Sequence, residues 1–403
     1  MRPGAALLLS VAVLGAPLAA AQDRFSTIAE LDMRWVSAES APSFLNGGVG
    51  VLRFDPEHEG VRVGHAMLDS RLRITDILSA HVVAFAYDDH DRNFADLSEA
   101  FIEARPFPTQ AIRWDAKAGA FFMPVSLENR GPGWTDVYTI TPSALNTWLG
   151  EEFRTIGTEV EARWLGASYG YLGDVALVGA IYGWNDPAGV LLAERGFGLT
   201  DRPSTLFGGL GDPPLTFYHK VDDKPGFYGG LSWRHEDLLE LRALRYDNRA
   251  DPGAATLTAH AWNTSFSSVG ARLEPGAAWT FILQFLDGQT AIGPFAAGTP
   301  LFQMTYNAAF ALTSFEWRSE RFTARFDDFR TNQFSGFFGP PRDDLGHAWT
   351  LGWMHEIGTG WQFAAEWIRV TSRFPPRLED GQPPGLIESQ LQLSARYRFH
   401  WRV

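Results

Sequence analysis

The sequence predicts an all-β protein, a transmembrane antiparallel up-and-down β-barrel of about sixteen strands. The main observation is the C-terminal segment, where every odd position from Leu391 to Val403 is apolar or aromatic and every even position from Gln390 to Arg402 is polar. Successive side chains of a strand point to opposite faces, so this segment has one apolar and one polar face. Such long alternation is typical of outer-membrane barrels, which are apolar outside and polar inside, more than of a periplasmic sandwich.

The same alternation recurs upstream. In residues 30–35, 112–118, 159–164 and 322–327, polar and charged residues occupy one parity and apolar residues the other. An arginine or lysine that faces lipid near the midplane costs about 2–4 kcal/mol. The charged parity must therefore line a wet lumen.

The N-terminus reads as an export signal, residues 1–21. Arg2 supplies a positive charge, residues 5–18 form an apolar region, and three alanines precede Gln22, the pattern of a secretory signal peptide. The alternative, an N-terminal membrane helix, is disfavoured because the run is short for a span. We expect a mature barrel of residues 22–403. Its strongest internal apolar run, 175–184, is about half of the ~20 residues that a spanning helix needs.

Composition excludes several function classes. The chain has 403 residues, a formal net charge of −13 and no cysteine. The acidic excess argues against nucleic-acid binding, and the lack of cysteine excludes disulfides, thiolate metal sites and cysteine nucleophiles. No P-loop, H-E-x-x-H or G-x-S-x-G motif occurs. We expect no cofactor, no metal and no catalytic residue.

The spacing of the alternating runs predicts the strands and their ends. Long and short gaps take turns along the chain, as expected when outer loops are long and periplasmic turns short, with both termini periplasmic. Residues 49–54 are assigned to the first outer loop, and 235–245 suits either a strand or a helix. The predicted strands are 28–36, 60–75, 79–89, 96–105, 110–122, 152–166, 173–184, 226–236, 238–248, 255–273, 277–287, 302–317, 320–330, 347–357, 360–372 and 387–403.

Two predicted outer loops carry helix signals. Thr141-Pro142 suits an N-cap followed by proline at the first helical position, and Gly150 suits the C-terminal cap. Residues 186–196 repeat the arrangement. We expect segment 123–151, the third outer loop, to fold into the lumen with a helix near 142–149. Trp148 should be buried there, with Glu151 and Glu152 approaching the aqueous path.

At this point the chain resembles the sixteen-stranded porins of the phosphate-selective porin superfamily in the broad sense. The similar runs are Glu99-Ala100-Phe101-Ile102-Glu103, residues 119–128, Thr141-Pro142-Ser143-Ala144 with Trp148, and Glu151-Glu152-Phe153-Arg154 with Gly157. The resemblance implies an outer-membrane channel with an inward-folded third loop, and a possible homotrimer. Phosphate-selective members carry basic constrictions, whereas this loop holds three acidic residues against Arg130 alone.

Parity and loop position give the candidate pore-lining and constriction residues. Cations and anions nearly balance along the predicted lumen, so we expect weak ion selectivity, near zero or slightly favouring cations. A salt-bridge lattice that only supports the wall is the alternative for any single residue. The candidates are Arg34, Arg71, Arg73, Arg113, Lys117, Glu128, Arg130, Glu151, Glu159, Glu161, Arg163 and Arg396.

These features predict a passive porin for small polar or charged solutes in the outer membrane of a Gram-negative bacterium. Its expected partners are outer-membrane lipid, lipopolysaccharide and small hydrophilic solutes. Two alternatives stay open. One is a non-conducting structural or adhesive barrel. The other is a hydrolase on the barrel rim, for which His90 and His347 are the candidates.

Overall fold

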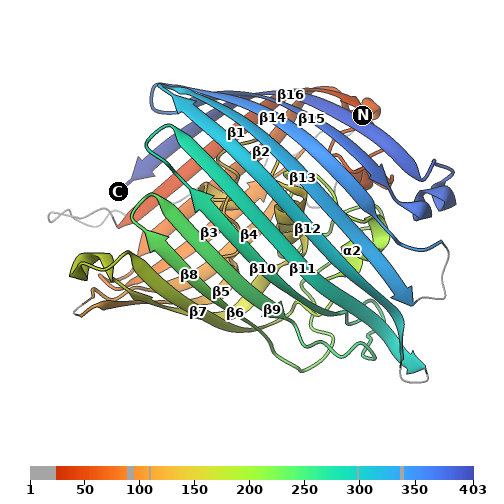
Figure 1. The fold of residues 1–403 in the computed structure, drawn as a ribbon, viewed down its shortest axis with the longest axis horizontal. Coiled ribbons are helices and arrows are strands. Elements are labelled where there is room, and N and C mark those ends of the chain that lie inside the picture. Colours follow the sequence, from red (N-terminus) through yellow and green to blue (C-terminus); the bar gives the residue numbers. More distant parts are fainter. Residues whose placement is uncertain (1–23, 89–94, 109, 297–298, 336–339) are drawn as a thin grey trace, which may run out of the picture.

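A computed structural model describes residues 24–403 apart from 89–94, 109, 297–298 and 336–339. The predicted signal peptide lies outside the described residues. Within the described part, sixteen antiparallel strands form one closed barrel (Figure 1). The strands are β1 Phe25–Glu39, β2 Gly60–Arg73, β3 Leu78–Ala86, β4 Ala95–Ala104, β5 Ile112–Phe122, β6 Arg154–Trp164, β7 Asp174–Gly183, β8 Gly226–His235, β9 Leu239–Asp247, β10 Asn263–Leu273, β11 Trp279–Ala296, β12 Thr299–Trp317, β13 Glu320–Ser335, β14 Leu345–Ile357, β15 Trp361–Arg373 and β16 Gly385–Arg402.

Each strand pairs with its neighbours in sequence, and β1 closes the barrel by pairing with β16. Phe25 and Val403 exchange two backbone hydrogen bonds of 2.9 Å, so the two ends of the barrel chain lie together. The turn between β12 and β13 lies at the same end and is only two residues long. We call this end, which also carries the other short turns, the short-turn end.

The predicted parity is confirmed. On β1, Trp35 is 43% exposed whereas Arg34 is 1% exposed. On β16, Phe399 is 51% exposed whereas Arg396 is 4% exposed. The apolar parity forms the outer surface and the polar parity faces inward, because a strand that closes a barrel can present only one of its faces to lipid.

Several predicted boundaries are wrong. Strand β10 begins at Asn263 instead of 255, because residues 255–260 form a small turn of their own. The predicted loop 288–301 is largely strand, since the β11–β12 ladder continues to the pair Ala296 and Thr299. The predicted strand 238–248 is confirmed as β9, so the alternative helix over 235–245 is wrong. The number of strands is confirmed in spite of these shifts.

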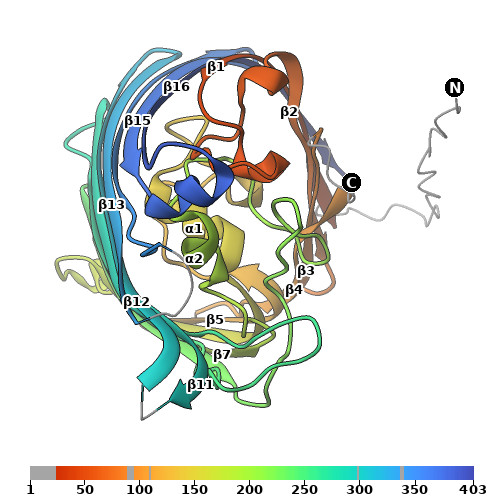
Figure 2. The same cartoon turned by 90° about the vertical axis from the view of Figure 1, so that its right-hand side faces the viewer.

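Two short α-helices lie in the long connections, α1 Ala144–Glu152 and α2 Val190–Arg195. Figure 2 shows both surrounded by the strands of the barrel. The predicted cap of α1 is wrong. Ser143 caps the helix, with its hydroxyl accepting a hydrogen bond from the Asn146 amide. Pro142 stays outside the helix, and its carbonyl accepts from Arg325 of β13 instead.

The largest apolar cluster of the described residues is internal and centres on α1. Trp148 is fully buried, and its ring contacts Phe153, Phe197 and Tyr306 at centroid distances of 4.5, 5.9 and 4.7 Å. Buried aromatic side chains contribute strongly to packing. None of the helices in the described part of the chain combines the length and apolarity needed to traverse a bilayer.

Candidate functional site

The connection between β5 and β6, residues 123–153, touches inward-facing side chains on distant strands. We call it the β5–β6 segment. The Leu127 amide donates to Gln284 on β11 at 3.3 Å. The Ile140 and Thr141 amides donate to one oxygen of Glu366 on β15, at 2.7 and 3.0 Å. Polar side chains that point inward from the barrel wall therefore bind the backbone of this segment.

Arg325 of β13 is the centre of a second group of contacts. Its guanidinium donates to Asp327 at 2.9 Å, to Thr139 Oγ1 at 2.8 Å and to the Thr141 carbonyl at 2.8 Å. The carboxylates of Glu128 and Asp136 lie 3.6 and 3.7 Å from the same side chain. All these charges are buried. A buried charge is tolerated only when paired and hydrogen-bonded, so Arg325 fixes the conformation of the segment.

The expectation that Glu151 and Glu152 approach water is wrong. Both are fully buried. Glu151 pairs with Arg195 of α2 and accepts from Thr200 Oγ1 at 3.1 Å. Glu152 accepts from the Trp148 indole and from the Leu191 amide at 2.9 Å. The end of α1 is covered by α2 and the chain after it, which the sequence of α1 alone could not indicate.

Burial raises the pKa of Glu152 to about 8. Hydrogen bonds from backbone amides and from the Trp148 indole lower this pKa, but burial has the larger effect. Burial likewise raises the pKa of Asp344, in the connection between β13 and β14, to about 7. Asp344 accepts from the Phe197 amide just after α2 at 2.9 Å. Two carboxyl groups that titrate near neutral pH thus hold the helices in place.

A charge ladder runs along the wall formed by β1 and β16. Arg34 donates to Asp32 at 2.7 Å, and Arg396 donates to the same carboxylate at 3.0 Å. Asp201, from the connection between β7 and β8, accepts from Arg34 at 2.5 Å. Burial opposes ionisation of Asp201, yet Arg34 and Arg53 hold its pKa well below the usual range. Arg34 lies flat against Gly64, where an added Cβ would lie 2.3 Å from Arg34 Nε.

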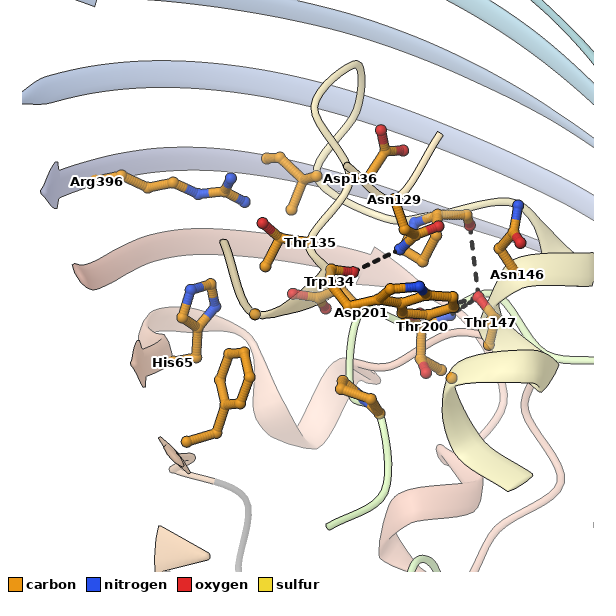
Figure 3. Close-up of a pocket in the computed structure, with 16 residues that line it drawn as sticks. His65, Asn129, Trp134, Thr135, Asp136, Asn146, Thr147, Thr200, Asp201 and Arg396 are labelled. Atoms are coloured by element: carbon orange, nitrogen blue, oxygen red, sulfur yellow. Dashed lines mark hydrogen bonds between the residues drawn. The ribbon is translucent and has the colours of Figure 1, made fainter. Parts of the chain in front are cut away.

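Beside this ladder, the β5–β6 segment and the 200–203 stretch enclose a cavity of about 30 Å³ (Figure 3). His65, Thr135 and Asp201 border it, and Thr200 donates to Thr147 Oγ1 at 3.3 Å across one side. A cavity needs at least about 10–15 Å³ of such space to hold one water molecule. The hollow on this side of the segment is therefore no larger than a few water molecules.

The wall of β2 to β6 carries most of the other candidate residues. Lys117 lies 3.3 Å from Glu159, and Arg163 lies 2.9 Å from Glu161. Arg71 lies 3.0 Å from Glu103. Arg113 is partly buried on the same inner face, and Arg73 is exposed at the end of β2. The five cations do not converge on one point, because they lie on three strands and most hold a local carboxylate.

The structure adds a basic group that was not among the candidates. Arg234, Arg242 and Arg272, on β8, β9 and β10, surround Glu240 of β9. Arg130 of the β5–β6 segment joins them, 3.5 Å from the same carboxylate. The parity of residues 232–242 could have identified the first two arginines. Arg130 approaches these arginines only because the β5–β6 segment is folded against the wall, which the sequence does not indicate.

Two hollows adjoin this basic group at the short-turn end. One, of about 390 Å³, is lined by Arg130, Arg242 and Lys117. The other, of about 770 Å³, is lined by Arg272 and by turn residues such as Gly276. We call the two hollows together the inner vestibule. Both hollows have polar lining residues and are open to solvent.

The described residues give little support to metal or hydrolytic chemistry. No group of three or more histidine or acidic side chains in the described ranges could hold a metal ion. His347 is exposed on the outer face and its ring lies 6.2 Å from that of Phe326. It therefore points away from the lumen. His90 lies outside the described residues.

Comparisons with known proteins place the fold. Neither a protein-family model nor a curated protein matches the sequence. The outer membrane channel DcaP of Acinetobacter baumannii superposes with a TM-score of 0.54 at 11% identity, covering 93% of this chain and 96% of that one. The anion-selective porin of Comamonas acidovorans gives 0.54 at 8% identity, covering 94% and 100%. In-vitro folded OmpT of Vibrio cholerae, in a trimer form, gives 0.50 at 10%, covering 93% and 98%.

The chain has the fold of the outer-membrane porins. The closed barrel and its apolar outer face are those of an outer-membrane β-barrel of a Gram-negative bacterium. At these identities the likeness shows the fold alone. Membership of the phosphate-selective superfamily stays a prediction.

Proposed function

We propose that this protein is a passive porin that lets small polar or charged solutes cross the outer membrane, without enzymatic activity. The observation that carries the proposal is the inner wall of paired charges in a closed barrel whose outer face is apolar. A barrel needs a polar lumen only where water or solutes meet it. The inner vestibule supports the same reading, because it offers polar space at the short-turn end.

In this proposal the β5–β6 segment narrows the pore, and the predicted pore-lining residues set its wall charge. The segment is held by Arg325 on β13 and Glu366 on β15, on the polar parity of the wall. The short turns face the periplasm, following the general rule for such barrels. Lipid and lipopolysaccharide surround the apolar face. A homotrimer is supported by the trimer form described for OmpT of Vibrio cholerae.

Conductance in planar bilayers tests the proposal. Purified protein should give discrete current steps in KCl, and proteoliposomes should swell in neutral sugars smaller than the pore. A heat-unfolded sample of the same preparation is the control. Folded protein that inserts without conductance or swelling would refute the channel.

One observation favours a second candidate, a non-conducting structural barrel. Three of the connections place fully buried residues among the strands, including Leu52, Trp148 and Leu192, and the hollow beside the β1–β16 wall is only about 30 Å³. A structural barrel would show no conductance in the wild type, whereas a variant lacking residues 130–148 would conduct. Conductance of the wild type itself would favour the channel.

A further inference from the structure

The tip of the β5–β6 segment, residues 130–135, forms a small turn inside the barrel. Asn129 and Asp136 pair across its base in an isolated antiparallel bridge, and the Gly131 amide donates to the Thr135 carbonyl at 2.9 Å. Most residues of the tip are half-buried or exposed, whereas the residues on both sides of it are almost all buried. We call residues 130–135 the segment tip, the part of the segment that borders open space.

The segment tip crosses the lumen between two walls. At one end, the nearest nitrogen of Arg130 lies 3.5 Å from the Glu240 carboxylate on β9. Further along the tip, the Gly133 amide donates to Asp69 on β2 at 3.2 Å. Strands β2 and β9 lie almost half the circumference apart in the closed ladder. The tip therefore forms a bar across the barrel.

Trp134 occupies a left-handed position within the segment tip. Its φ is +63°, and that of the preceding Gly133 is +61°, a conformation that a bulky side chain rarely adopts. The indole ring stacks on Phe122 of β5, with centroids 4.3 Å apart and planes 9° apart. Its edge lies against Gly150 of α1, where an added Cβ would lie 2.7 Å from Cζ3 of the ring. The ring thus fills the space between the β5 wall and α1.

Trp134 and its neighbours separate two hollows. Asn129, Gly133 and Trp134 line both the cavity of about 30 Å³ beside the β1–β16 wall and the hollow of about 390 Å³ in the inner vestibule. Figure 3 shows the Trp134 indole reaching from the segment tip toward Thr147 of α1. Because these residues border both spaces, they form a partition that is one side chain thick.

The position of the ring depends on two small opposing effects. Stacking on Phe122 holds the indole in place, whereas the left-handed backbone of Trp134 costs a comparable free energy. Gly133 beside it adopts either sign of φ without strain, so the tip can rearrange. The base of the tip stays fixed, because Asp136 lies 3.7 Å from the buried Arg325. The ring is therefore a movable element on a fixed base.

We propose that Trp134 is the size-determining residue of the pore. Its indole closes the passage between the inner vestibule and the cavity beside the β1–β16 wall, and a solute passes only when the ring rotates aside. The proposal deepens the channel function by naming the residue that selects solutes by size, and it rests on that function for its physiological role. Trp134 was not among the candidate pore-lining residues, because its place in the partition depends on contacts with β5 and α1.

Thiol labelling of the full-length protein in detergent micelles tests the partition without relying on conductance. The chain has no cysteine, so Thr147→Cys provides a single reporter in the smaller cavity. Thr147 is 2% exposed, so a small charged methanethiosulfonate should label the cysteine slowly. Adding Phe122→Leu removes the stack but keeps the indole, and should speed labelling by up to about tenfold. Adding Trp134→Gly should speed it further, because glycine adopts the left-handed conformation freely and only the ring is lost.

Two more variants in the Thr147→Cys background control this experiment. Trp349→Ala removes a lipid-facing ring of β14 that is 51% exposed, and should leave the labelling rate unchanged. Gly150→Ala places a Cβ against the indole edge, and should speed labelling although alanine favours a helix more than glycine does. Heat-modifiable migration in gels checks that every variant is folded. Labelling of folded Trp134→Gly at the rate of Trp349→Ala would overturn the proposal.

Conductance and sugar permeation separate this proposal from the channel function. Trp134→Gly should conduct more than the wild type in KCl and should admit larger sugars in proteoliposome swelling, with Trp134→Phe between the two. A wild-type conductance that Trp134→Gly leaves unchanged would keep the channel and overturn the role of Trp134. Faster labelling in Trp134→Gly without conductance by either protein would keep the partition and remove the channel.

Discussion

Replacing Arg325 with methionine should detach the β5–β6 segment and destabilise the barrel. Methionine has a similar length but no charge, so Asp327, Glu128 and Asp136 would lose the cation that faces all three. Removing one partner of a buried ion pair costs about 3–5 kcal/mol. The segment also loses the bonds that reach Thr139 Oγ1 and the Thr141 carbonyl.

We therefore expect Arg325→Met to lower the free energy of unfolding by about 3–5 kcal/mol, measured by urea titration in detergent micelles with tryptophan fluorescence. The loss should shrink at acidic pH, because burial raises the pKa of Glu128 and of Asp136 and protonation removes their uncompensated charge. Single-channel conductance should increase as the segment leaves its place.

Two further variants test the cause of this effect. Asp327→Asn in the Arg325→Met background removes one stranded charge and should recover part of the loss. Arg249→Met changes an exposed arginine in the connection between β9 and β10 and should alter stability by no more than about 0.5 kcal/mol. A loss below about 1 kcal/mol for Arg325→Met, or no recovery in the double variant, would refute the idea that Arg325 holds the segment.

Four other predictions follow from the sequence and the site. Deleting residues 130–148 should raise single-channel conductance; an unchanged value would show that the segment does not narrow the pore. Because burial raises the pKa of Glu152 to about 8, from a value near 4.5 in the unfolded chain, its stabilising contribution is complete below about pH 4.5, declines as pH rises and is fully lost above about pH 8. The hydrogen-exchange protection factors of α1 should therefore fall between about pH 4.5 and 8 and level off above 8, and Glu152→Gln should reduce that fall; identical profiles would contradict it. The reversal potential in a salt gradient should be near zero or slightly cation-favouring, whereas strong anion selectivity would show that the vestibule arginines dominate the whole pore. Mass spectrometry should find the mature N-terminus near Gln22 in the outer-membrane fraction, and an intact Met1 would exclude the signal peptide.

Local sequence determined the barrel. The period-two alternation of strands such as β1 and β16 assigned the inner and outer faces correctly, because a residue in a strand has only two directions in which to point. The alternation of long and short gaps predicted sixteen strands, since the short turns join the strands at one end of the barrel and the long connections join them at the other. The gap pattern does not locate the strand ends, because the β11–β12 ladder continues through residues that this pattern predicts as loop.

Only the tertiary structure decided which charges meet. Glu151 and Glu152 carry no signal for burial in their own helix, and they are covered because α2 and residues near Thr200 pack on them. Arg130 and Arg234 are more than a hundred positions apart in sequence, yet both approach Glu240. The energy of a charge depends on the distance to its neighbours and on burial, and closure of the barrel around its loops sets both.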